Sequence, residues 1–174
     1  METAVLIGPK HTGKTSVGRA LAGLLDVPFI DLDEAVTART GKTPRALYRE
    51  GPEVFRAAET EALRSLLEET AGRRVIAAGG GTADNAAASA LLVNTAGVRL
   101  LYIEVSEETA WERIQLAAGR TGELPPFLNT ANPRETHRAL YTRRAAACRA
   151  LAHITAAGEN AAPEAIAQRL LTML

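Results

Sequence analysis

Gly8-Pro9-Lys10-His11-Thr12-Gly13-Lys14-Thr15 matches the pattern G-x-x-x-x-G-K-[ST] at every specified position. It follows the apolar run 4–7, which has the length and composition of a buried strand, and it precedes residues 16–25, whose apolar side chains recur with helical spacing. Glycines let the backbone of such a loop turn its N–H groups towards an anion, and the following helix adds its positive N-terminal end. The motif therefore predicts a phosphate-binding loop between a strand and a helix.

The last residues of this motif have separate roles in binding a nucleoside triphosphate. Lys14 is expected to reach the β and γ phosphates, and the Thr15 hydroxyl is expected to bind Mg²⁺, which prefers hard oxygen ligands. Ser16 opens the helix and is the last residue expected to contact the nucleotide. The alternative is a glycine-rich turn that only caps a helix. The complete match between a strand and a helix favours ATP and Mg²⁺ as cofactors.

Four more short apolar runs predict strands, at residues 27–30, 75–78, 98–103 and, with a weaker pattern, 152–155. Helical segments separate them, so the chain alternates buried strands with helices. This alternation predicts an α/β fold: a three-layer α/β/α sandwich with a five-stranded parallel sheet. Ligands of such sheets bind at the carboxyl ends of the strands.

The domain organisation follows from what interrupts this alternation. No internal repeat or linker is evident, which predicts a single domain over residues 1–174. One irregular stretch, approximately residues 119–134, is rich in Gly, Pro and Asn and is the candidate for a mobile lid.

Composition and charge argue against several other classes of protein. Twenty basic and twenty acidic side chains give zero net charge, so no global field attracts nucleic acid or an anionic membrane. The single cysteine, Cys148, excludes an internal disulfide framework and is expected to be a small buried side chain. We recognise no secretory signal and no run of transmembrane length. The expectation is a cytoplasmic monomer that acts on a small molecule.

Asp31-Leu32-Asp33 directly follows the second predicted strand. Both carboxylates are expected on the same side of the chain, at the sheet edge that carries the phosphate loop. Asp31 could then hold Mg²⁺ through water, and Asp33 could accept a substrate hydroxyl. Aspartate is also a favoured helix N-cap, and a helical stretch begins here, so both interpretations remain open from these residues alone.

Two arginines and a glycine run are candidates for binding a second, anionic ligand. Arg56 adjoins the apolar stripe of its helix and could enter a cleft, held by Glu59, although a solvated Arg–Glu pair is the alternative. Arg144 is on an inward helical face, where its charge needs a partner, either an anionic substrate or a buried acid. Gly79-Gly80-Gly81 follows a buried strand and could let a ligand touch the main chain, or could simply be a flexible loop.

In order and spacing these motifs resemble the shikimate kinase family along nearly the whole chain. The elements that carry the resemblance are the phosphate loop, Phe29-Ile30-Asp31-Leu32-Asp33, Gly51-Pro52-Glu53-Val54-Phe55-Arg56-Ala57-Ala58-Glu59, Gly79-Gly80-Gly81, a proline-containing lid and Arg144. The resemblance implies ATP-dependent phosphorylation of the 3-hydroxyl of shikimate, a step of aromatic amino-acid biosynthesis. The alternatives are a related gluconate-type or nucleotide kinase, or a nucleotide-binding relative with impaired catalysis.

The resemblance also implies a role for each matched residue. Residues 8–16 would bind ATP, with Arg120 on the adenine, and Thr15 and Asp31 would bind the metal. The shikimate contacts would be Asp33, Arg56, Gly79, Gly80, Gly81 and Arg144. Lys14, Asp33 and Arg120 would be the catalytic residues.

The chain departs from the family's pattern in two places. Pro125-Pro126-Phe127-Leu128 stands where the family usually has Arg-Pro-Leu-Leu, so the lid arginine is absent at its matched position. Arg120 is the only basic residue between Arg113 and Arg134, and we expect it to contact the adenine and also to lend charge to the phosphates. The alternative is that Arg120 only stacks on adenine. After Arg144, Ala146-Ala147-Cys148 replaces the usual Pro-Leu-Tyr and predicts a repacked C-terminal helix.

Overall fold

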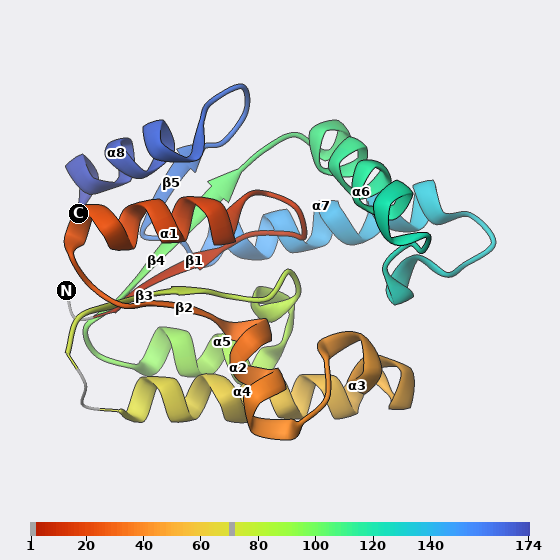
Figure 1. The fold of residues 1–174 in the computed structure, drawn as a ribbon, viewed down its shortest axis with the longest axis horizontal. Coiled ribbons are helices and arrows are strands. Elements are labelled where there is room, and N and C mark those ends of the chain that lie inside the picture. Colours follow the sequence, from red (N-terminus) through yellow and green to blue (C-terminus); the bar gives the residue numbers. More distant parts are fainter. Residues whose placement is uncertain (1–2, 70–71) are drawn as a thin grey trace.

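The computed structural model describes residues 3–69 and 72–174, and its centre is a parallel sheet (Figure 1). The described residues form five strands in the order β2-β3-β1-β4-β5. All four pairings between them are parallel. This confirms the predicted sheet. The strands are β1 (Thr3–Ile7), β2 (Phe29–Asp31), β3 (Arg74–Ala77), β4 (Val98–Glu104) and β5 (Ile154–Ala157).

Helix ends explain why β2 and β5 begin later than predicted. β2 begins two residues after the predicted start because the N–H of Val27 still donates to Ala22 O at the end of the preceding helix, at 3.1 Å. β5 likewise begins at Ile154 because Ala152 caps the preceding helix, where its N–H donates to Cys148 O at 3.0 Å. Both residues are apolar, so the sequence pattern alone assigns them to the strands.

Helices cover both faces of the sheet, which confirms the three-layer sandwich (Figure 1). In the described residues they are α1 (Lys14–Leu25), α2 (Leu32–Thr40), α3 (Pro44–Glu50), α4 (Pro52–Glu68), α5 (Ala86–Asn94), α6 (Glu107–Thr121), α7 (Pro133–Leu151) and α8 (Pro163–Met173), with short 3₁₀ turns η1 (Thr82–Asp84) and η2 (Pro126–Leu128). Helices α1 and α8 pack together on one face. None of the helices in residues 3–69 and 72–174 is long and apolar enough to span a bilayer.

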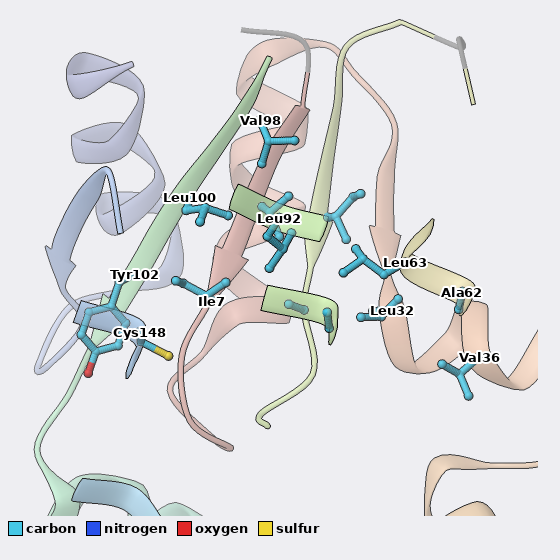
Figure 2. Close-up of a cluster of buried hydrophobic side chains, with 14 of the residues drawn as sticks. Ile7, Leu32, Val36, Ala62, Leu63, Leu92, Val98, Leu100, Tyr102 and Cys148 are labelled. Atoms are coloured by element: carbon cyan, nitrogen blue, oxygen red, sulfur yellow. The ribbon is translucent and has the colours of Figure 1, made fainter. Parts of the chain in front are cut away.

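Alternation along β1 builds both halves of the core. Ala4 and Leu6 pack into the cluster formed with α1 and α8, whereas Val5 and Ile7 pack into the cluster formed with α2, α4 and α5. Figure 2 shows the second cluster, in which Ile7 lies among side chains from the other strands and helices and Cys148 lies beside Tyr102. Cys148 is buried, as predicted. Because β1 is buried on both faces, the loop that follows Ile7 starts from a fixed position.

The carboxyl ends of the strands lie at one edge of the sheet, where the predicted site residues follow them. The segment between the two helices that flank the predicted lid is shorter than the sequence indicates, since α6 continues to Thr121 and α7 begins at Pro133. Gly119 is accommodated inside α6, and Gly122 ends that helix with a left-handed φ of 78°. The irregular part therefore covers residues 122–132 and contains η2.

Candidate active site

The phosphate loop is organised around the Lys14 side chain. The Lys14 Nζ donates to the carbonyl oxygens of Gly8 (2.9 Å) and Pro9 (2.8 Å), and the Thr12 hydroxyl also donates to Pro9 O (3.1 Å). Lys14 and Thr12 are both buried. Burial lowers the pKa of the Lys14 ammonium to about 8. These contacts place a cation at the N-terminal end of α1, where a phosphate group would be bound.

Thr15 and Asp31 lie in direct contact across neighbouring elements. The Thr15 hydroxyl donates to Asp31 Oδ2 at 2.9 Å, while Asp31 Oδ1 accepts from the backbone N–H of Asp33 at 3.0 Å and so caps α2. The two interpretations of Asp31 left open by the sequence are therefore compatible, because each carboxylate oxygen has its own partner. A hydroxyl and a carboxylate side by side fit the hard-donor preference of Mg²⁺, so Thr15 and Asp31 would hold that ion.

A cavity of about 660 Å³ lies over the phosphate loop. One wall is a single face of α6, formed by Arg113, Leu116, Ala117 and Arg120, which recur at helical spacing. Arg113 Nη1 donates to the carbonyl oxygen of His11 at 3.1 Å and so ties α6 to the loop. Arg113 is not among the site residues predicted from the sequence, although its position seven residues before Arg120, on the same helical face, indicates a shared site.

A second cavity, of about 130 Å³, adjoins the first on the side of α3 and the lid. Lys10, Asp33 and Gly80 line both cavities. Gly81 and Arg144 line the second cavity only, together with Tyr48 of α3, Phe55 of α4 and Phe127 of the lid. The structure thus brings the phosphate loop, Asp33, the glycine run and Arg144 together around two adjoining cavities. We call this second space the acceptor cavity.

Arg144 is a buried cation whose pairing is incomplete. The Arg144 side chain is 15% exposed, and its Nε lies 3.6 Å from Asp84 Oδ2, which is too far for a hydrogen bond. In the described part of the chain the buried Nε has no hydrogen-bond partner. Asp84 instead accepts from Arg143 at 2.5 Å. The guanidinium lies 5.1 Å from the Phe127 ring centroid. Burial lowers the pKa of Arg144. Asp84 is therefore an ion-pair partner of Arg144, the buried acid that the sequence left open, and an anion in the acceptor cavity would be a second partner.

Arg56 and Glu59 do not pair with each other, although their spacing on α4 allowed such a pair. The structure pairs Arg56 with Glu53 at 3.5 Å, and its side chain is 44% exposed. Glu59 is buried and accepts from Thr82 Oγ1 at 2.6 Å and from Asn85 Nδ2 at 3.1 Å. The reason is that Glu59 lies one turn further along α4, beneath segment 79–85, whose polar side chains donate hydrogen bonds to the Glu59 carboxylate. Arg56 is not among the residues that line the acceptor cavity within ranges 3–69 and 72–174.

The glycine run is explained by close packing. A Cβ at Gly79 would lie 2.5 Å from Glu59 Oε1, and a Cβ at Gly80 would lie 2.8 Å from the backbone nitrogen of Lys10. Real Cβ atoms do not approach other atoms this closely. Gly80 requires glycine because its contact is with backbone, whereas a side chain at Gly79 would displace the Glu59 carboxylate from its hydrogen bonds. At Gly81 a Cβ would lie 3.2 Å from Arg144 Nη2. The run therefore lets β3 lead directly into a tight contact with the phosphate loop and the buried Glu59.

Phosphate loops of this kind occur in hydrolases and in kinases, and the acceptor cavity separates the two. A hydrolase needs room only for water, whereas a kinase must place an acceptor molecule beside the γ-phosphate. Fold and cavities together define a P-loop kinase.

The comparisons with known proteins identify the family within this class. The family model described as shikimate kinase matches residues 11–174. A shikimate kinase of Thermobifida fusca (strain YX) is 39% identical over 166 residues, covering 95% of this chain and 90% of that protein. One of Salinispora arenicola (strain CNS-205) is 37% identical over 171 residues, covering 98% and 96%. A solved structure of shikimate kinase from Acinetobacter baumannii in complex with shikimate has a TM-score of 0.86 at 31% identity, covering 99% of this chain and 92% of that one. The chain belongs to the shikimate kinase family, as the motifs predicted.

Proposed function

We propose that this chain transfers the γ-phosphoryl group of ATP to the 3-hydroxyl of shikimate. The observation that carries the proposal is the junction of the two cavities at Lys10, Asp33 and Gly80. A nucleotide in the larger cavity and an acceptor in the smaller one would meet there, beside a carboxylate. The acceptor cavity of about 130 Å³ suits a small polar molecule better than a second nucleotide, which favours shikimate over the nucleotide-kinase alternative.

On the nucleotide side, the chain's own groups bind and position the phosphates. Lys14 and the backbone N–H groups of residues 8–16 other than Pro9 would hold the β and γ phosphates, while Thr15 and Asp31 would hold Mg²⁺. The ion supplies neutralising charge to the phosphate oxygens when it is bound. Arg120 lines the same cavity on the α6 face, which supports its predicted contact with adenine.

On the acceptor side, Asp33 would accept the 3-hydroxyl of shikimate and orient it towards the γ-phosphorus. Burial raises the pKa of the Asp33 carboxyl, and among the neighbouring charges that of Lys10 lowers it most. A carboxylate with a raised pKa is better able to take the hydroxyl proton. Arg144, with Gly81 beside it, would bind the substrate carboxylate. Arg56 would bind the same carboxylate only if its exposed side chain turns into the acceptor cavity.

A coupled assay of ADP formation with a panel of acceptors tests the proposal. With ATP and Mg²⁺ at saturation, we expect shikimate to stimulate ADP formation strongly, and gluconate and AMP to give no more than the background rate. Stimulation by gluconate or AMP alone would assign the chain to another small-molecule kinase. Folded protein that binds ATP but gives no stimulation with any acceptor would favour a nucleotide-binding relative with impaired catalysis.

The remaining sequence expectations accompany this function. We infer that residues 1–174 act as one domain, as a cytoplasmic monomer that binds neither nucleic acid nor membrane. We also infer that the lid, predicted over residues 119–134 and irregular over 122–132, moves during turnover. The zero net charge supports the inference that the protein binds neither nucleic acid nor an anionic membrane. Light scattering at micromolar protein tests the monomer, and a stable dimer would contradict it.

A further inference from the structure

The junction of the two cavities limits which side chains can touch the phosphoryl group while it is transferred. Only Lys10, Asp33 and Gly80 line both spaces among the described residues. Gly80 has no side chain and Asp33 is anionic, whereas the charge that develops in phosphoryl transfer is negative. Lys10 is therefore the one cationic side chain at the place where the γ-phosphoryl group would leave the nucleotide and reach the acceptor.

The main chain holds Lys10 firmly at this junction. Gly80 packs so closely against it that a Cβ there would lie 2.8 Å from Lys10 N and 3.0 Å from Lys10 Cα. The residue itself is exposed, and in the described part of the chain no acidic group forms an ion pair with it. Its backbone is thus fixed while its ammonium can reach an anion from either cavity.

Other nearby cations are less suitably placed. Arg120 lines the nucleotide cavity but not the acceptor cavity, and Arg45 lines the acceptor cavity but not the nucleotide cavity, within residues 3–69 and 72–174. Arg45 also forms an ion pair with Glu123 of the lid. The lid residues at the acceptor cavity, Pro125, Pro126 and Phe127, carry no charge. Lys14 lines the nucleotide cavity but not the acceptor cavity, and its Nζ is bound to the carbonyl oxygens of Gly8 and Pro9.

We propose that Lys10 is a catalytic residue, whose ammonium contacts the γ-phosphoryl oxygens from the acceptor side and stabilises the charge of the transition state. This inference rests on the proposed function. In the step, the bond between the γ-phosphorus and the β–γ bridging oxygen breaks as the bond to the shikimate 3-oxygen forms. The hydroxyl proton passes to Asp33, ADP leaves with the bridging oxygen, and Lys10 keeps its proton throughout.

The test compares Lys10→Met and Lys10→Gln with Lys10→Arg, which keeps the charge. Lys42→Met is the matched control, because Lys42 is exposed, pairs with Glu50 and lines neither cavity. Loss of one stabilising group at a developing charge typically lowers kcat by about 100-fold or more, so we expect that reduction in both neutral variants. Lys10→Arg should keep at least about a tenth of wild-type kcat, and the dissociation constant for ATP should change less than about threefold in all variants.

Binding of a transition-state analogue separates catalysis from a structural role. Calorimetry with ADP, fluoroaluminate and shikimate should show a loss of affinity in the neutral variants that parallels the fall in kcat, whereas binding of ADP and shikimate alone should not change. Unchanged kcat, or a fall in kcat without weaker fluoroaluminate binding, would overturn the inference. Wild-type protein that forms no ADP with shikimate would overturn the proposed function and this inference together. An active wild type with fully active neutral variants would overturn the inference alone.

Discussion

Replacement of Arg144 by methionine separates the functional role of this side chain from a structural one, because the two roles predict opposite outcomes. In the proposed complex the guanidinium binds the substrate carboxylate in a largely desolvated pocket. Loss of one partner of such a contact costs about 2 to 5 kcal/mol. At about 1.4 kcal/mol for each factor of ten, the dissociation constant for shikimate should rise by roughly 30-fold to roughly 4,000-fold.

The stability of the protein should change little in the same variant. Arg144 Nε is buried without a hydrogen-bond partner in the described residues, and removal of such an atom recovers about 1 to 3 kcal/mol. Against this, the cation–π contact with Phe127 is lost, at a cost of about 0.5 to 2 kcal/mol. Asp84 retains its hydrogen bond from Arg143. From these two contributions the free energy of unfolding should lie between about 1 kcal/mol below and about 2.5 kcal/mol above that of the wild type. The 3.6 Å ion pair with Asp84 is lost as well, and the functional role of Arg144 predicts that this loss costs little.

Shikimate titration calorimetry and urea denaturation measure the two quantities, with Arg138→Met as the control. Arg138 is on the same helix, its side chain is 66% exposed, and its ion-pair distance to Glu107 is 4.0 Å. The control should change neither quantity appreciably. Shikimate affinity that survives in Arg144→Met, together with a loss of about 3 kcal/mol or more in unfolding free energy, would refute the reasoning. It would show that Arg144 serves as the structural partner of Asp84.

Three further predictions concern the rest of the site. Asp33→Asn should lower kcat by about 100-fold or more while ATP affinity is nearly kept. The control is Glu34→Gln, one residue further on the exposed side of α2, which should behave as wild type. Loss of ATP binding with normal kcat in Asp33→Asn would show that Asp33 does not act on the acceptor side. Because the pKa of Lys14 is lowered to about 8, its charge is lost in the free protein as pH rises through that value, so kcat/KM for ATP should fall above about pH 8; a profile that is flat to pH 9.5 would contradict this. In the unfolded chain Lys14 keeps its proton up to about pH 10.5, whereas in the folded protein it loses the proton from about pH 8. The contribution of Lys14 to the free energy of unfolding should therefore increase as pH rises from about 8, and urea denaturation at pH 8 and pH 10 measures this change. At saturating ATP, Arg120→Ala should lower kcat if this arginine also lends charge to the phosphates, and it should raise only KM for ATP if it contacts adenine alone. Pro125→Arg should raise kcat if charge from the lid limits the reaction. Unchanged kcat in both variants would reject a catalytic charge from the lid.

The fold could be predicted because its signals are local. The run 4–7 is entirely apolar and ends in the phosphate loop, and the later strands follow the same pattern of a short apolar run between helices. The boundaries at Val27 and Ala152 were predicted wrongly. Their backbone N–H groups close the preceding helices, and side-chain type carries no information about that hydrogen bond.

The candidate site was predictable where the topology brings strand ends together. Asp31 ends β2, and Thr15 lies in α1 shortly after β1; only β3 separates the two strands, and the two side chains are in contact at 2.9 Å. Their role in metal binding stays a prediction. The partner of Glu59 was not predictable, since it comes from segment 79–85, more than 20 residues away, and depends on how α4 packs. The same packing leaves Arg56 exposed. The junction at Lys10 depends on the shapes of two cavities, which no residue pattern encodes.

Identification of the phosphorylated product tests the central claim most directly. The protein is incubated with ATP, Mg²⁺ and shikimate, and the product is examined by ³¹P and ¹H NMR spectroscopy. We predict a phosphate monoester whose phosphorus couples to the proton on carbon 3 of shikimate, formed in equal amount to ADP. Formation of ADP with inorganic phosphate instead of a shikimate ester, or an ester at another hydroxyl, would contradict the proposed transfer at the junction of the two cavities.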